Sequence, residues 1–275
     1  VGGFAMSHVK TSMLNEQVME VRLSRPDQLN AISPEMLDGI IAAMKQAEYS
    51  REVRVVVLTG EGRGFCAGAD LTTQSGPGDI PGTEGMSGLG FTYKYQERIA
   101  EAALAIHECD KPVIAAINGA AVGGGLAFAL ACDMRLAAKG AKLGSVFIQT
   151  GLSSCDIGVS YFLPRLVPPT KAMELMVTGR VFLAEEADEL GLLNGLVEPG
   201  GLADKALELA CAIAANSEYG VWMTKKGFWN NLDAPSLRHA IDVENRTQVL
   251  GTFTGCMEEK MNAFVEGRAP RWKPL

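Results

Sequence analysis

The sequence predicts an α/β protein whose C-terminal part consists of helices alone. As far as about residue 200, short strand-like runs rich in β-branched residues alternate with helix-like runs. From Leu202 onward the strand-like runs stop. Alternation of this kind is typical of a sheet whose faces are covered by helices. We therefore divide the chain into a core at residues 1–200 and a helical region at residues 201–275.

The first expected elements are a strand, a helix and a second strand. Residues 18–23 alternate between apolar and polar, which predicts a strand. Ser33 and Pro34 have the pattern of an N-cap and a first helical residue, and we expect this helix to run to about Ala47. Residues 53–58 are rich in valine, which predicts a buried strand.

A glycine-rich and proline-rich segment interrupts the core at residues 72–90. It contains few large apolar residues, so we expect a mobile loop that could act as a lid. A helix at 91–109, a strand at 112–117, a helix at 124–132 and a strand at 134–138 are expected to follow.

Four helices are expected in the C-terminal region, at residues 202–216, 218–230, 235–250 and 254–266. The last two carry more large apolar residues than one small appendage needs: Leu250, Phe253, Met257, Met261 and Phe264. Two interpretations stay open for these side chains. They form a contact between subunits, or they are buried against the chain's own core.

Composition restricts the classes of partner and the expected compartment. The net charge is −7 and no block of basic residues is present, so we expect no nucleic-acid partner. No apolar run is long enough for a membrane span, and residues 1–7 lack the pattern of a signal peptide. The six cysteines show no disulfide framework and the three histidines are scattered. We therefore expect a cytoplasmic protein without a metal site.

Two glycine-rich turns carry the functional signal. They are residues 65–70, Phe-Cys-Ala-Gly-Ala-Asp, and residues 118–125, Asn-Gly-Ala-Ala-Val-Gly-Gly-Gly. Each follows a strand-like run and precedes a helix-like run, and the first N–H groups of a helix have no partner inside it. Two such turns that converge would form an oxyanion hole, which stabilises a carbonyl oxygen as it gains negative charge.

An ordered series of motifs resembles the enoyl-CoA hydratase/isomerase family, the crotonase superfamily. The resemblance covers about Val18 to Lys273. Its parts are residues 25–31 (RPDQLNA), both glycine-rich turns, residues 132–135 (CDMR), 163–165 (LPR), 178–180 (TGR), 184–187 (AEEA) and 191–193 (GLL).

This resemblance implies a spiral of ββα units that assembles into a homo-oligomer, a trimer or a hexamer, through its C-terminal helices. It implies an acyl-CoA thioester as substrate, an enolate intermediate, a place in fatty acid metabolism and no cofactor beyond the coenzyme A of the substrate. The two oxyanion N–H groups fall on Ala69 and Gly124. The positions that contact coenzyme A are Leu29, Ala31, Ala67, Gly68 and Leu71.

The sequence departs from the hydratase pattern at both catalytic glutamates. Those positions fall on Ala127 and Phe147, which would instead line an apolar acyl pocket. Asp156 matches the aspartate of the family's dienoyl-CoA and epoxyphenylacetyl-CoA isomerases, since it stands eight residues before Pro164. One extra residue after Gly151 leaves the direction of its side chain open.

Two interpretations of Asp156 follow. On a loop facing an apolar pocket, desolvation would raise its pKa and make it the acid/base of the reaction. Alternatively, its side chain caps a short helix that starts near Val159. We expect double-bond isomerisation with proton transfer by Asp156. Hydration, and acyl-CoA binding without turnover, stay open as alternatives. Asp70 is expected to cap a following helix, and Arg25 to be structural or to contact a phosphate of coenzyme A.

Overall fold

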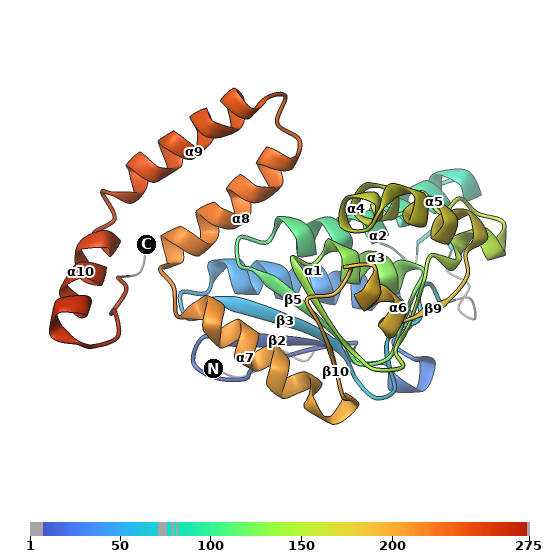
Figure 1. Cartoon of the computed structure of the whole chain (residues 1–275). Coiled ribbons are helices and arrows are strands. Elements are labelled where there is room, and N and C mark those ends of the chain that lie inside the picture. The colour runs from blue at the N-terminus through green and yellow to red at the C-terminus, as the bar shows by residue number, and fades with distance from the viewer. Residues whose placement is uncertain (1–7, 71–75, 79, 81, 274–275) are drawn as a thin grey trace.

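The computed structural model describes residues 8–70, 76–78, 80 and 82–273. Within them the chain forms a six-stranded sheet, a four-stranded sheet and ten α-helices (Figure 1). This confirms the α/β class. None of the described helices is both long and apolar enough to span a bilayer.

The large sheet has the strand order β1-β2-β3-β5-β7-β10. The strand β1 (Val9–Met13) is antiparallel to β2 (Val18–Leu23), and the other neighbouring pairs are parallel. The remaining strands are β3 (Val55–Gly60), β5 (Val113–Ile117), β7 (Met134–Ala138) and β10 (Gly195–Val197).

The small sheet has the order β4-β6-β8-β9. Its strands are β4 (Gly64–Cys66), β6 (Ala120–Val122), β8 (Lys142–Gly144) and β9 (Phe182–Leu183), and the first three run parallel.

The expected ββα units connect the two sheets. In each unit one strand enters the large sheet, the next enters the small sheet, and a helix follows. The successive units are β3-β4-α2 (Gly88–Glu108), β5-β6-α3 (Gly124–Ala131) and β7-β8-α4 (Val159–Leu166). Because the second strands are parallel neighbours, the turns that follow them lie at one edge of the small sheet.

Helices bury both faces of the large sheet. Val55 and Val57 of β3 pack in one cluster with α7 (Leu202–Ala214), whereas Val56 and Leu58 pack with residues of α1 (Pro34–Tyr49), α2 and α3. A strand covered on both faces needs apolar residues at every position, which explains the valine run. The other elements of the core are α5 (Pro169–Thr178), α6 (Ala184–Glu189) and the 3-10 helices η1 (Pro26–Gln28), η2 (Val146–Thr150) and η3 (Pro199–Gly201).

The last three helices form an arm that projects from the body (Figure 1). They are α8 (Glu218–Leu232), α9 (Leu237–Gly251) and α10 (Cys256–Glu266). Lys225 of α8 fastens the arm, since its Nζ lies 2.8 Å from Asp133 Oδ2 and both side chains are almost completely buried. The predicted boundary near residue 200 stays a prediction; α7 packs on the large sheet, and the arm begins with α8.

The predicted long elements are confirmed to within a few residues. The strand at 18–23 is β2, and the Ser33 hydroxyl accepts a hydrogen bond from the Met36 N–H at the start of α1. The four C-terminal helices are α7 to α10. For the expected loop at 72–90, α2 begins at Gly88, and residues 72–75, 79 and 81 lie outside the described part of the chain.

Candidate active site

The two glycine-rich turns meet at the edge of the small sheet. The strand β4 leads into residues 67–69, and its parallel neighbour β6 leads into Gly123 and Gly124. A methyl group built on Gly68 would lie 3.4 Å from the Gly124 nitrogen, and one built on Gly124 would lie 3.9 Å from the Gly68 Cα. Gly68 has a φ of +83°, a conformation that glycine adopts without strain.

The hydrogen bonds on either side of Ala69 direct its N–H away from the paired segment at Ile32. The Ile32 N–H donates to the Gly68 carbonyl at 2.8 Å, and the Asp70 N–H donates to the Ile32 carbonyl at 3.3 Å. In this parallel bridge the N–H of Ala69 points to the opposite side. Among the described residues, neither the Ala69 N–H nor the Gly124 N–H donates to a backbone carbonyl. Both are therefore available to an oxygen atom of a ligand.

The segment at residues 29–31 is held against the first turn. The Ala67 N–H donates to the Leu29 carbonyl at 3.0 Å, and Leu29 and Asn30 both have positive φ. The buried Asn30 amide donates to the carbonyls of Gly64 and Glu61 at 2.8 and 3.0 Å. Four of the expected contacts with coenzyme A, at positions 29, 31, 67 and 68, therefore lie in one hydrogen-bonded unit, while Leu71 lies outside the described residues.

Arg25 and Asp70 form an ion pair beneath this segment. The guanidinium donates from Nη2 to Asp70 Oδ2 at 2.9 Å and from Nη1 to the Ala31 carbonyl at 2.6 Å. The side chains are only 12% and 7% exposed. The sequence suggested that Asp70 caps a helix, but in the structure Asp70 pairs with Arg25 instead. Arg25 therefore has a structural role, because the same guanidinium also holds the Ala31 carbonyl in place.

Both positions of the hydratase glutamates are apolar in the folded chain. Ala127 is completely buried on α3, and its N–H donates to the Gly123 carbonyl at 3.1 Å. The half-buried Phe147 of η2 follows β8, the next parallel strand, and its Cε1 would lie 3.9 Å from a methyl group built on Gly123. At the position of the second hydratase glutamate, the loop after β8 therefore places an aromatic ring beside the second turn.

Asp156 lies in the loop before α4, and its interpretation as a helix cap is wrong. The N-cap of α4 is Gly158, which provides no side-chain hydrogen bond, and the Asp156 backbone carbonyl accepts from the Val159 N–H at 2.8 Å. The carboxylate instead accepts a hydrogen bond from the Gln96 amide of α2. Burial raises the pKa of Asp156, while hydrogen bonds from the Ile157 amide and from Gln96 oppose that rise.

Ile157 connects the Asp156 loop to the second turn. Its Cδ1 would lie 3.5 Å from a methyl group built on Gly124. Its φ of +46° is a strained conformation for a β-branched residue, and such strain is concentrated at functional sites. The loop that carries Asp156 therefore lies directly against one of the two turns.

Two features of the site escaped sequence reasoning. Gln96 lies on the helix expected at 91–109, but nothing in its spacing indicated a contact with Asp156. The left-handed conformation of Ile157 has no signal in the sequence, because β-branched residues normally avoid it.

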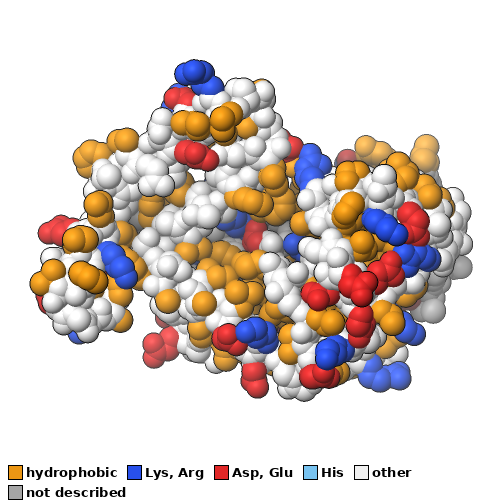
Figure 2. All heavy atoms as spheres, viewed as in Figure 1, with side chains coloured by type: hydrophobic (Ala, Val, Ile, Leu, Met, Phe, Trp, Pro, Cys, Tyr) orange, Lys and Arg blue, Asp and Glu red, His pale blue; other side chains and the backbone are white. Residues whose placement is uncertain are grey.

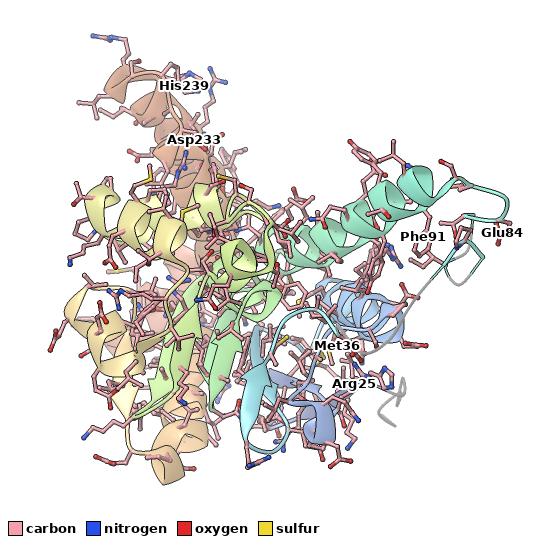
Figure 3. The ribbon with its side chains drawn as sticks, turned by 90° about the vertical axis from the view of Figure 1, so that its right-hand side faces the viewer. Arg25, Met36, Glu84, Phe91, Asp233 and His239 are labelled. Atoms are coloured by element: carbon pink, nitrogen blue, oxygen red, sulfur yellow. The ribbon has the colours of Figure 1, made fainter. Side chains whose placement is uncertain are left out.

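The helix α2 extends beyond the sheets, with Phe91 near its outer end and Glu84 in the loop before it (Figure 3). Gln96 follows Phe91 by five residues on the same helix. A helix in this position can contribute side chains to a site at the sheet edge.

The thiol in the first turn is unreactive at neutral pH. Cys66 is completely buried, and burial raises the pKa of its thiol to about 12, so it is a poor nucleophile at neutral pH. Within residues 8–70, 76–78, 80 and 82–273, no three histidine, cysteine or acidic side chains are grouped so that they could hold a metal ion.

Comparisons with known proteins agree on one family. The family model described as "Enoyl-CoA hydratase/isomerase" matches residues 13–274. The chain is 36% identical to a probable enoyl-CoA hydratase of Mycobacterium bovis over 92% of this chain and 88% of that protein. It is 34% identical to the 1,2-epoxyphenylacetyl-CoA isomerase of Escherichia coli over 98% of both chains. The structure of a probable enoyl-CoA hydratase/isomerase from Mycobacterium abscessus superposes with a TM-score of 0.89, at 33% identity, over 97% of this chain and 99% of that one.

Proposed function

The chain belongs to the enoyl-CoA hydratase/isomerase family of enzymes, and from that premise we propose that it binds an acyl-CoA thioester and moves a double bond in the acyl group. One observation carries this proposal. The turns at Gly68 and Gly124 touch, and the Ala69 and Gly124 N–H groups have no backbone acceptor among the described residues.

The first step is polarisation of the thioester. Its carbonyl oxygen accepts hydrogen bonds from the N–H groups of Ala69 and Gly124, and negative charge that develops on this oxygen is stabilised by donors already in place. Donors of this kind typically contribute about 2.7–4 kcal/mol each to the stability of a transition state. The N-terminus of α3, which begins at Gly124, adds a favourable dipole.

The second step is transfer of one proton by Asp156. The carboxylate removes a proton from the carbon next to the double bond, and the electron pair moves into the conjugated enolate of the thioester. The protonated Asp156 then returns the proton to the far carbon of the former double bond. Burial favours this role because it raises the pKa of Asp156 toward the range in which one group works as both base and acid.

Isomerisation fits the residues better than the hydration performed by two carboxylates. Ala127 and Phe147 occupy the positions that resemble the two hydratase glutamates, and neither side chain can hold a water molecule or move a proton. A full-length relative is named as a 1,2-epoxyphenylacetyl-CoA isomerase, which supports a reaction that shifts bonds within the acyl group. Hydration that uses Asp156 alone is the second candidate, since other relatives are named enoyl-CoA hydratases.

The coenzyme A part of the substrate is assigned to the segment that covers the first turn. Leu29, Ala31, Ala67 and Gly68 lie together there, and Leu71 completes the predicted set. No other cofactor is proposed, because the proton transfer needs only the thioester, the two N–H groups and one carboxyl.

We also assign the arm to assembly of a trimer or a hexamer. The large apolar residues that the sequence singled out are strongly exposed in the single chain: Leu250, Phe253, Met257, Met261 and Phe264. A cleft of about 880 Å³ separates α8 from α9 and the start of α10. Hydrophobic side chains also surround the hollow between the arm and the body (Figure 2). Exposed apolar patches of this kind typically mark protein interfaces.

The test compares the wild type with Asp156→Asn on a series of 3-enoyl-CoA and 2-enoyl-CoA thioesters. We expect kcat for isomerisation to fall by about 10²–10⁴ in the variant, the usual contribution of a general acid/base. The dissociation constant from calorimetry should change little, since the amide occupies the same volume. Wild-type turnover by the variant would remove Asp156 from the mechanism. Tight binding by the wild type with no turnover of any thioester would instead support a binding protein.

A further inference from the structure

The amide of Gln96 reaches from α2 to the carboxylate of Asp156, a residue 60 positions further along the chain. We infer that Gln96 is a positioning residue that fixes the Asp156 carboxyl and sets the pH at which it works. This inference rests on the proposed function, because it concerns the proton carrier of that reaction.

The hydrogen bond counteracts the effect of burial on Asp156. Burial is the largest influence on the carboxyl and favours its neutral form, whereas the Gln96 amide and the Ile157 N–H both favour its charged form. A base that must accept a proton has to be ionised beforehand. Gln96 therefore favours the form of the half-buried Asp156 carboxyl that can accept a proton.

Among the described residues, burial and two hydrogen bonds, and no charged side chain, account for the pKa shift of Asp156. On α2, the Lys94 ammonium pairs with Glu97 at 2.6 Å, and on α4 the Arg165 guanidinium pairs with Asp233 at 2.8 Å. Within the part of the chain that the structure describes, no cation forms an ion pair with Asp156. The carboxyl is controlled by neutral donors, so its proton affinity follows from hydrogen bonding and burial.

A glutamine suits a group that changes its protonation state. Its amide carries both N–H donors and a carbonyl acceptor, so it can donate to the carboxylate and, after rotation, accept from the protonated acid. A lysine at this position would lower the pKa of the acid far more strongly and hold it as a carboxylate. The neutral side chain therefore guides the carboxyl in both halves of a proton transfer.

The experiment measures the pKa of the Asp156 carboxyl directly, by ¹³C NMR titration of protein labelled at aspartate. The test variant is Gln96→Leu. The matched control is Gln46→Leu, which makes the same change at an exposed position of α1. The signal of Asp156 is assigned from its loss in Asp156→Asn. We expect Gln96→Leu to raise the pKa by about half to one unit, since one donor to the charged form is removed, and Gln46→Leu to leave it unchanged.

Turnover provides the second readout. In Gln96→Leu the acidic limb of the pH profile of kcat/KM should move to higher pH by the same amount as the NMR pKa. The value of kcat should fall several-fold, with KM nearly constant. Gln96→Glu replaces the donor by a second carboxylate, whose negative charge disfavours ionisation of Asp156. This variant should move the acidic limb to still higher pH. If both variants titrate and turn over like the wild type, the inference is overturned.

The two proposals can fail separately. If Asp156→Asn turns over normally, the acid/base role of Asp156 is wrong, and the inference about catalysis falls with it even where Gln96 still controls the NMR titration. If Asp156→Asn is inactive while Gln96→Leu leaves both the titration and the pH profile unchanged, only the inference about Gln96 is wrong.

Discussion

Gly68 and Gly124 lie so close together that a methyl group on Gly68 would come within 3.4 Å of the Gly124 nitrogen. The contact joins two segments that are far apart in the sequence, and it exists because β4 and β6 are parallel neighbours. Any side chain at Gly68 would have to push the turns apart. The spacing of the two N–H groups therefore depends on the glycine.

Gly68→Ala should abolish turnover of acyl-CoA thioesters and lower stability. The new methyl group would lie 2.9 Å from the Val122 carbonyl oxygen, which is backbone and cannot move aside cheaply. The positive φ of Gly68 adds a strain of about 1–2 kcal/mol for an alanine. Urea denaturation and steady-state kinetics measure the two effects.

Gly140→Ala is the matched control for that variant. Gly140 also has a positive φ, +75°, but a methyl group there meets nothing within 4 Å. The control should lose a similar amount of stability from strain and retain its kcat. Equal losses of kcat in both variants would contradict the role of the contact between the turns.

The sequence predicts the long elements well because their signals are local. Ser33 caps α1 as its residue type indicates, and the valine run of β3 reflects burial on both faces. The strands β4, β6, β8 and β9 have only two or three residues each, too few for a periodic pattern. Local patterns therefore did not locate the strands of the small sheet, which the resemblance to a spiral of ββα units had implied.

The candidate site was predictable where the chemistry lies in one segment. The two turns and Asp156 were identified from their motifs, but the contact of Asp156 with Gln96 joins separate elements and depends on how α2 packs. The conformation of Ile157 is imposed by its surroundings against the preference of a β-branched residue. Such features arise from tertiary structure, and no local pattern encodes them.

Lys225→Met should destabilise the protein by about 3–5 kcal/mol, the usual cost of removing one partner from a buried ion pair. Lys225 Nζ lies 2.8 Å from Asp133 Oδ2, and the side chains are 6% and 12% exposed. Without the lysine, the Asp133 carboxylate retains the neutral donors of Val113 and Trp229 among the described residues. Urea denaturation measures the loss.

The adjacent lysine provides the control. Lys226 pairs with Asp110 at 2.7 Å, but both side chains are about half exposed. Lys226→Met should therefore cost only about 0–1 kcal/mol. Similar losses in both variants would show that burial of the Lys225 pair does not hold α8 on the core.

Phe253→Ser should lower the mass of the assembly in solution. Phe253 is 83% exposed on the arm of the single chain, so its ring has an apolar environment only if another subunit covers it. Light scattering coupled to size-exclusion chromatography measures the mass. Tyr49→Ser is the control, because Tyr49 is 86% exposed at the end of α1 and lies outside the arm. A wild-type protein that is monomeric at micromolar concentration would contradict the assigned role of the arm.

Asp156→Asn should be more stable than the wild type at pH 7. Burial raises the pKa of Asp156, so the native state binds this proton more tightly than the unfolded chain does. The stabilisation from the proton is present at low pH and is lost as the pH rises through the folded-state pKa. Above that pKa the wild type holds a partly desolvated carboxylate, which the variant lacks. The advantage of the variant should shrink as the pH falls toward the ordinary aspartate value of 3.8.

Asp233→Asn should change the stability of the protein at pH 7 in the opposite direction to Asp156→Asn. Hydrogen bonds from Tyr161 and Arg165 lower the pKa of Asp233, so its carboxylate stabilises the native state at neutral pH. That stabilisation is lost as the pH falls below 3.8, the ordinary pKa of aspartate, and then through the lower pKa of Asp233 in the folded state. Asp233→Asn should therefore be less stable than the wild type at pH 7, with a difference that disappears in acid. Thermal unfolding from pH 3 to pH 7 compares the two variants, and a stability change of the same sign in both at pH 7 would contradict the assignment of Asp156 as a desolvated acid.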